Sequence, residues 1–358
     1  MPRDGAFPRR GRARIDALRY RIESRVSRTA SAALAAALLV VAVVVAAPAL
    51  AGGGKPPAEL ALGWKTDFSR HVVPFDQFQS GGPGKDGIPA LDHPRFATVA
   101  KTTYLKSNEP VVAFRRRAYP LQILIWHEIV NDRVGGVPVA VTFCPLCNTA
   151  IVFDRRVRGR VLDFGTTGNL RFSDLVMYDR QTESWWQQFG GAGLVGRYAG
   201  ARLRTLSAQI VSWADFKRTN ARGLVLTRET GYARPYGRNP YTGYDDASTP
   251  PLFPVANSGD KRLQPKERVV FIERGGKAAA VPFSVLVKKK RVTFELAGHR
   301  LDVRVTGRVS SALDDSVIAD SRRIPTVEVR EQGKLVPFDT PFWFAVAAFR
   351  PGVVIVRG

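Results

Sequence analysis

Cysteine is almost absent from this chain of 358 residues, which contains only two, and histidine is also scarce, at four. Both cysteines lie in one motif, Cys144-Pro145-Leu146-Cys147, so a framework of several disulfides is excluded. The roughly 300 residues that follow the N-terminal segment can bury an adequate core without such cross-links. We therefore interpret the pair as retained for chemistry.

Several enzyme motifs are missing too. The chain has no G-x-S-x-G, H-E-x-x-H or dinucleotide-binding motif, so it carries no signature of the hydrolases and dehydrogenases that use them. The glycine-rich run 81–87 lacks the spacing of a phosphate-binding loop and the Ser or Thr after its lysine, which excludes nucleotide binding. Asp86, within this run, remains a candidate ligand-binding residue.

Charge is absent from Thr29 to Gly54, whereas residues 1–28 carry nine arginines and three acidic residues. This pattern predicts a basic cytoplasmic n-region (1–28) followed by a signal peptide or membrane anchor (29–51). The Ala49-Leu50-Ala51 pattern favours cleavage, but an apolar run of about 18–20 residues is also long enough to stay in the membrane. Either way we expect an extracytoplasmic protein, periplasmic or secreted, with anchoring to the inner membrane as the alternative to cleavage.

Basic residues outnumber acidic ones in this chain. Residues 52–358 hold 45 basic and 28 acidic side chains, and the basic ones are scattered rather than aligned on one helix. Such a surface can hold an anionic envelope polymer loosely, although arginine used simply for solubility explains the same composition. Nucleic-acid binding is not expected of an exported chain that lacks a recognisable motif.

Helical signals are few. Residues 52–63 read as a Gly-Pro-Ala linker, and from Trp64 to the end (64–358) short β-branched and aromatic runs alternate with Gly, Asp, Asn and Pro. Ser212-x-x-Asp215 is the best helix start. We therefore expect one globular domain of the α+β class, predominantly β, with antiparallel sheets. The predicted strands are 111–114, 122–126, 137–143, 150–153, 160–164, 175–178, 223–226, 269–272, 292–296, 301–305 and 353–356.

A partial internal repeat indicates two related β units packed as one composite domain. Residues 118–124 (Ala-Tyr-Pro-Leu-Gln-Ile-Leu) and 280–286 (Ala-Val-Pro-Phe-Ser-Val-Leu) share an A-x-P-Φ-x-Φ-L pattern, each after a short predicted strand. Chance similarity between β-rich segments is the alternative explanation. The second copy has no cysteine, so any thiol chemistry belongs to the first.

Strand-like segments flank the C-x-x-C motif, 138–143 before it and 149–153 after it, which predicts that it lies at the tip of a β-hairpin. Two thiolates at a hairpin tip form a metal knuckle, and with no second C-x-x-C available, His127 is the nearest third ligand. Glu128 and Asp132 would orient His127 or add oxygen ligands. Zinc or copper suits this donor set. A redox dithiol serving a periplasmic redox partner, and a structural disulfide, are the alternatives.

Two further segments are candidate ligand-binding surfaces. Residues 174–188 are dense in aromatic and amide groups, and Asp179 and Trp186 would form part of a carbohydrate-stacking face unless the tryptophans pack in the core. Residues 228–246 form a long loop with four tyrosines, suited to a carboxylate or phosphate or else pinned over the core. Its candidate residues are Arg228, Glu229, Tyr236 and Arg238.

The chain resembles the domain of unknown function 3179 family. The resemblance rests on Lys85–Asp92, on Val130-Asn131-Asp132, on Thr142–Thr149, on Met177-Tyr178-Asp179 with Thr182, Ser184 and Trp186, and on Arg228–Gly231. It covers roughly residues 67–349 and implies secreted or membrane-anchored prokaryotic proteins with no established activity. It identifies no catalytic residue.

Taken together, these features predict an extracytoplasmic protein whose C-x-x-C hairpin binds a soft metal ion or acts as a redox pair. The alternative is a non-enzymatic envelope module that binds saccharide or an anionic ligand. Whether the chain is an enzyme stays open.

Overall fold

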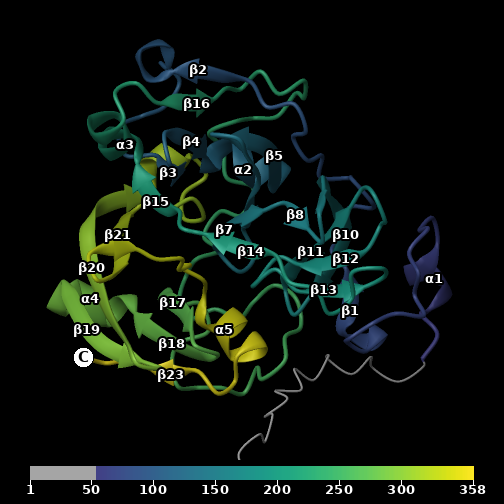
Figure 1. Cartoon of the computed structure of the whole chain (residues 1–358). Helices are drawn as coiled ribbons and strands as arrows, with labels where there is room; N and C mark the ends of the chain where they lie inside the picture. Colours follow the sequence, from purple (N-terminus) through teal and green to yellow (C-terminus); the bar gives the residue numbers. More distant parts are fainter. Residues whose placement is uncertain (1–53) are drawn as a thin grey trace, which may run out of the picture. The chain divides into compact units, whose positions relative to one another are not determined.

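The short β-type runs form strands in a computed structural model that describes residues 54–358 (Figure 1). Strands make up 40% of these residues and helices 13%, and the sheets are arranged like the five blades of a propeller. The expected α+β, predominantly β, fold class is thereby confirmed. The predicted n-region and the 29–51 segment lie outside the described residues. No helix within residues 54–358 has the length and apolar character needed to cross a membrane.

Three sheets belong to the first half of the described chain. One holds β1 (Phe78–Ser80), β10 (Phe164–Arg171), β11 (Asp174–Asp179), β12 (Trp185–Gln187) and β13 (Gly193–Val195). The next holds β14 (Arg204–Leu206), β7 (Thr149–Asp154), β6 (Val137–Cys144) and β5 (Ile129–Val134), followed in the chain by the small hairpin of β8 (Arg156–Val157) and β9 (Arg160–Val161). The third holds β15 (Gln209–Ser212), β3 (Pro110–Phe114), β4 (Arg117–Pro120), β16 (Leu224–Leu226) and β2 (Phe96–Thr98).

Two sheets form the second half. The smaller holds β17 (Val269–Arg274), β18 (Lys277–Pro282) and β23 (Val354–Ile355), and the larger holds β19 (Arg291–Leu296), β20 (His299–Ser310), β21 (Arg323–Glu331) and β22 (Lys334–Leu335). Short helices connect the strands throughout. They are α1 (Ala58–Ala61), α2 (Leu121–His127), α3 (Trp213–Thr219), α4 (Phe283–Lys289) and α5 (Trp343–Phe349), with single 3₁₀ turns at Phe75–Gln77, Val99–Lys101 and Ile318–Asp320.

The predicted repeat is a duplication of structure. In each copy a hairpin (β3–β4 or β17–β18) ends at a proline, Pro120 or Pro282, that precedes a seven-residue helix, and each helix ends at a residue of positive φ, Glu128 (56°) or Lys290 (61°). A second antiparallel hairpin follows. Later in each copy, α3 or α5 leads to a strand that pairs in parallel with the first hairpin. The two β units are therefore related.

One expected strand is a helix instead. Residues 122–126 lie inside α2, because Pro120 has φ −63° and directs the chain into a helical turn despite the β-branched residues that follow. The predicted helix start is confirmed, since the Ser212 side chain accepts a hydrogen bond from the Asp215 backbone N–H. Helices α4 and α5 were not expected.

A single large hydrophobic cluster joins the two units. It includes Phe143 and Trp186 from the first unit and Phe342, Trp343 and Val346 from the second. The described residues, 54–358, form one compact unit. The hairpin tip that carries the cysteines therefore lies where the two β units pack together, rather than at a free surface.

Candidate metal centre

The C-x-x-C motif lies at the tip of a β-hairpin, as predicted. Strands β6 and β7 are antiparallel, and Cys144 at the end of β6 pairs with Thr149 at the start of β7. Asn148 turns the chain with a φ of 56°, a conformation that Asn tolerates better than most residues. Unlike an exposed tip, this one is buried, and Cys144 and Cys147 are 1% and 0% exposed.

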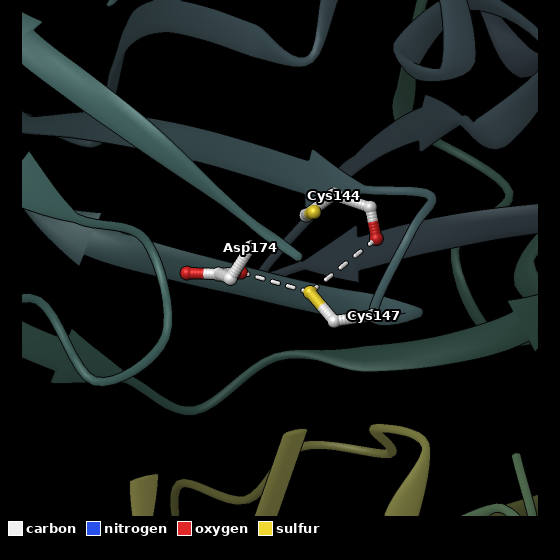
Figure 2. A group of neighbouring side chains, drawn as sticks. All are labelled: Cys144, Cys147 and Asp174. Atoms are coloured by element: carbon white, nitrogen blue, oxygen red, sulfur yellow. Dashed lines mark hydrogen bonds between the residues drawn. The ribbon is translucent and has the colours of Figure 1, made fainter. Parts of the chain in front are cut away.

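Three donor atoms converge at this tip (Figure 2). The sulfur atoms of Cys144 and Cys147 and a carboxylate oxygen of Asp174 all lie within 4.8 Å of one another. Asp174 begins β11, and its Oδ1 lies 2.8 Å from the Cys147 Sγ. Its other oxygen accepts a hydrogen bond from the Phe189 backbone N–H at 2.8 Å, which fixes the orientation of the carboxylate. This set of two thiols and one carboxylate is suited to a divalent cation.

Burial dominates the acid–base behaviour of these groups. It raises the pKa of the Asp174 carboxyl to about 6, and it also raises the pKa of both cysteine thiols. The neighbouring carboxylates raise the thiol pKa values further. In the absence of a cation the thiols therefore stay protonated at neutral pH, and a protonated thiol is a poor nucleophile.

Glu128 adds a fourth acidic group beside this site. Its backbone carbonyl accepts a hydrogen bond from the Phe143 N–H at 2.8 Å, which places it next to the residue that precedes Cys144. Glu128 is 6% exposed, and its carboxylate makes no hydrogen bond with any residue that the structure describes. Burial, together with the charge of Asp174, raises its pKa to about 8. Glu128 is thus a carboxylate without a partner, close to the thiols.

His127 does not belong to this group, contrary to expectation. Its Nδ1 lies 2.8 Å from the Pro89 carbonyl oxygen and its Nε2 lies 2.7 Å from the Tyr236 hydroxyl, so both ring nitrogens are engaged elsewhere. Asp174 is the third donor instead. Asp132 is also elsewhere, because its carboxylate binds Arg117 at 2.9 Å and the Tyr119 hydroxyl at 2.5 Å. Of the two supporting residues predicted, only Glu128 approaches the cysteines.

The proposed carbohydrate-stacking face does not exist at the surface. Trp185 and Trp186 are both 0% exposed. The Trp186 Nε1–H donates to Asp179 Oδ2 at 3.0 Å, and Asp179 also accepts the Thr182 backbone N–H at 2.7 Å. Asp179 and Trp186 thus form a buried structural network, and core packing, the alternative interpretation, describes both tryptophans.

The candidates in the 228–246 loop lie in several places. Arg228 donates to the Gln122 side chain at 2.8 Å, and Glu229 is 3.5 Å from Arg95 at the surface. Tyr236 binds His127, and the exposed Arg238 forms a backbone bridge with Val317. None of these residues joins the Cys144–Cys147–Asp174 group. Asp86, from the glycine-rich run, accepts hydrogen bonds from Arg180 and the Tyr178 hydroxyl.

Two other tyrosines of the same loop cover the cysteines. Burial raises the pKa of Tyr241, with Glu128 and Cys144 as further causes, and burial raises that of Tyr244, with both cysteines contributing. Tyr244 also packs against Phe342, whose backbone N–H donates to the Cys147 carbonyl oxygen at 2.9 Å. The hairpin tip is therefore covered from two sides, by the 228–246 loop and by the second β unit.

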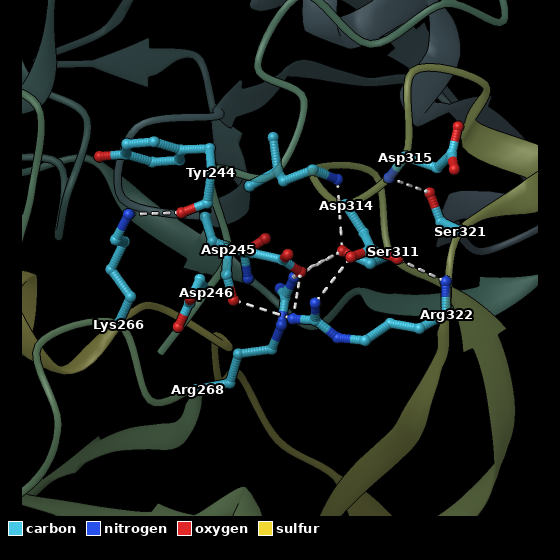
Figure 3. Close-up of polar contacts among 12 residues, drawn as sticks. Tyr244, Asp245, Asp246, Lys266, Arg268, Ser311, Asp314, Asp315, Ser321 and Arg322 are labelled. Carbon is cyan, nitrogen blue, oxygen red and sulfur yellow. Dashed lines mark hydrogen bonds and ion pairs between the residues drawn. The ribbon is translucent and has the colours of Figure 1, made fainter. Parts of the chain in front are cut away.

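An ion-pair network fastens this loop to the second unit (Figure 3). The fully buried Asp245 carboxylate lies 2.6 Å from Arg268 and 2.9 Å from Arg322, and it accepts a hydrogen bond from the Ser311 hydroxyl. Lys266 donates to the Tyr244 carbonyl oxygen in the same network. The network holds Tyr244 in place above the buried thiols.

Asp174 is the one donor that the sequence patterns did not single out as a ligand. A signal was present, because a carboxylate begins a run that reads as a fully buried strand (Asp174–Asp179). Charged groups are rarely buried unless they are paired or coordinate a metal.

Comparison with known proteins gives a family but no activity. The family model described as protein of unknown function (DUF3179) matches residues 85–353. Neither the curated proteins nor the solved structures contain a match to this chain. The matched region includes the hairpin tip, Asp174, Glu128 and the 228–246 loop. Since the family model spans most of its length, the chain belongs to the DUF3179 family of proteins of unknown function.

Proposed function

We propose that this chain is an extracytoplasmic metal-binding protein in which Cys144, Cys147 and Asp174 bind one zinc ion. The observation that carries the proposal is the convergence of three buried donor atoms within 4.8 Å. Ligand atoms that share one zinc ion lie about 3–4 Å apart, because each bond measures about 2.0–2.3 Å. Small side-chain movements are therefore enough to close the site on an ion.

The donor set favours zinc over copper. Copper(I) prefers soft thiolate and thioether ligands, whereas zinc accepts thiolates and carboxylates together. Zinc also usually takes four ligands, and Glu128 is a carboxylate without a hydrogen-bond partner among the described residues whose charge acts on Cys144. We assign it the fourth position.

Burial argues against a redox dithiol. Thiol–disulfide exchange requires the attacking thiolate to reach a sulfur atom of the pair, and both sulfurs here lie beneath Tyr244 and Phe342. A cation that neutralises several buried acidic groups accounts for the same arrangement without a partner protein.

Elemental analysis combined with thiol counting tests the proposal. The full-length protein, produced with its own N-terminus and recovered without reductant, should hold about one zinc ion per chain. Cys144→Ser and Asp174→Asn should each remove the metal. His127→Ala is the matched control and should retain it, because both ring nitrogens bond elsewhere.

Two other outcomes would reject zinc binding. Protein that contains no metal and no free thiol, but gains two thiols on mild reduction, would be a redox pair. Protein that retains its zinc in the Asp174→Asn variant would have its site elsewhere. The extracytoplasmic location has its own test, since a reporter fused after residue 60 should be active only outside the cytoplasm. Reporter activity in the cytoplasm would reject the location but not the metal site.

A further inference from the structure

A polar hollow opens near His127, away from the cysteines. It measures about 370 Å³, and its lining includes Asp86, Pro89, Asp92, Arg180, Tyr232 and Arg234. A second hollow of about 170 Å³ shares Asp92 and Tyr232 with it, so the two adjoin. Three segments that are far apart in the sequence supply these residues, namely the 85–94 run, the end of β11 and the 228–246 loop.

His127 fastens two of these segments together. A carbonyl oxygen can only accept, so Nδ1 carries the hydrogen that is donated to Pro89, and Nε2 accepts the hydroxyl hydrogen of Tyr236. Burial lowers the pKa of His127, which favours this neutral form. The 85–94 run is also fixed along β5. The Leu91 backbone N–H donates to the Ile129 carbonyl oxygen, and the Asn131 backbone N–H donates to the Leu91 carbonyl oxygen. The hollow therefore has preformed walls.

The charges in the polar hollow are balanced. Arg180 lies 2.9 Å from Asp86 and 3.2 Å from Asp92, and Arg234 is the second cation in the lining. Two carboxylates and two guanidinium groups thus face one space in a chain whose net charge is +23. A site for an anionic polymer would carry more cationic groups than carboxylates. This hollow instead favours an uncharged ligand.

Hydrogen-bonding capacity remains after Arg180 has paired with both carboxylates. Asp92 accepts the Asn131 side-chain N–H at one oxygen, at 2.7 Å, and pairs with Arg180 at the other. A carboxylate oxygen can accept more than one hydrogen bond, so both oxygens of the partly exposed Asp92 can still accept hydroxyl groups. Ligand hydroxyls match this capacity without adding charge.

Tyr232 supplies an aromatic face at the rim. It is 46% exposed, which is unusual for a large aromatic side chain, and its ring lies 5.4 Å from that of the buried His127. An exposed ring beside paired, planar polar groups can pack against the C–H face of a sugar while those groups bind its hydroxyls. We infer that the polar hollow binds a neutral saccharide.

Binding of defined oligosaccharides to the full-length protein tests this inference. The probes are cellohexaose, chitohexaose and maltohexaose, with hexagalacturonate as the anionic counterpart, measured by isothermal titration calorimetry. At least one neutral hexasaccharide should bind, and Tyr232→Ala and Asp92→Asn should each weaken it tenfold or more. Val287→Ala, an exposed apolar position on α4 in the second unit, is the control and should bind as the wild type does.

His127→Ala separates this site from the metal centre. It should weaken saccharide binding, because it releases Pro89 and Tyr236, while the zinc content stays unchanged. Cys144→Ser should do the reverse. The inference is overturned if no neutral hexasaccharide binds, if hexagalacturonate binds more tightly, or if Tyr232→Ala and Asp92→Asn leave the affinity unchanged.

Discussion

Glu128 imposes a cost on the metal-free protein that can be measured. Burial and the charge of Asp174 raise the pKa of this carboxyl from 4.5 to about 8. At a pH between these two pKa values, Glu128 is ionised in the unfolded chain and protonated in the folded chain. Roughly two and a half pKa units separate 4.5 from pH 7, at about 1.4 kcal/mol each, so Glu128 destabilises the fold by about 3 kcal/mol at pH 7.

The sign of the pH dependence follows from the raised pKa. Below pH 4.5 both states are protonated and the cost vanishes, and it grows as the pH rises towards 8. Glu128→Gln removes the ionisation but keeps the shape of the side chain. The metal-free variant should therefore be more stable than the wild type by about 3 kcal/mol at pH 7, and about equally stable at pH 4.

Urea denaturation followed by tryptophan fluorescence measures this difference, with a chelator and a reductant present, from pH 4 to pH 8. Glu295→Gln, at an exposed position on β19, is the control and should change stability little at any pH. Equal stabilities of wild type and Glu128→Gln across the range, or a gain that shrinks as the pH rises, would refute the reasoning.

Zinc should reverse the effect. If Glu128 occupies the fourth position on the ion, its negative charge is compensated when zinc is bound. The Glu128→Gln variant should then lose its advantage in zinc-saturated protein and should bind zinc more weakly. An advantage that persists with zinc would place Glu128 outside the coordination sphere.

Two further predictions concern the structure around the site. Asp245→Asn leaves Arg268 buried without its counter-charge and should cost about 3 kcal/mol of unfolding free energy, measured by urea denaturation, whereas a loss below about 1 kcal/mol would mean that the network is not energetically coupled. Trp186→Phe removes the buried Nε1–H donor to Asp179 and should cost about 2 kcal/mol in the same assay, and an unchanged stability would contradict a structural role for that contact.

The sequence predicted the strands well and the helices poorly. Strands such as β6 and β7 follow β-branched runs that are bounded by turn residues, and this local pattern is sufficient. Helix α2 was missed because six of its seven residues are buried, so no polar face marks a helical period. Pro120, directly before α2, was the usable signal, and Pro282 stands in the equivalent position before α4.

The sequence predicted only those parts of the site whose residues are close together in the chain. The cysteines share one short motif, so their convergence follows from the hairpin. Asp174 comes from a different sheet, and no spacing rule connects it with the cysteines. His127 was chosen because it is the histidine nearest in sequence, but it occupies the last position of α2, where its ring meets Pro89 and Tyr236 instead.

The duplication separates what the scaffold requires from what the site requires. Glu128 and Lys290 terminate equivalent helices with nearly the same φ, yet Lys290 is exposed and Glu128 is buried beside the thiols. By strand register, Cys144 corresponds to Thr306, where β20 continues to Ser310 instead of turning.

The fold thus tolerates a lysine at the position of Glu128 and an uninterrupted strand at the position of Cys144. A buried carboxylate and a cysteine turn are costly additions that folding alone does not explain. The second unit, which lacks both, instead supplies Phe342 and the Arg268 network that cover the first unit's hairpin tip. One copy thus carries the acidic groups and the other carries the groups that enclose them, so the enclosed site needs both copies.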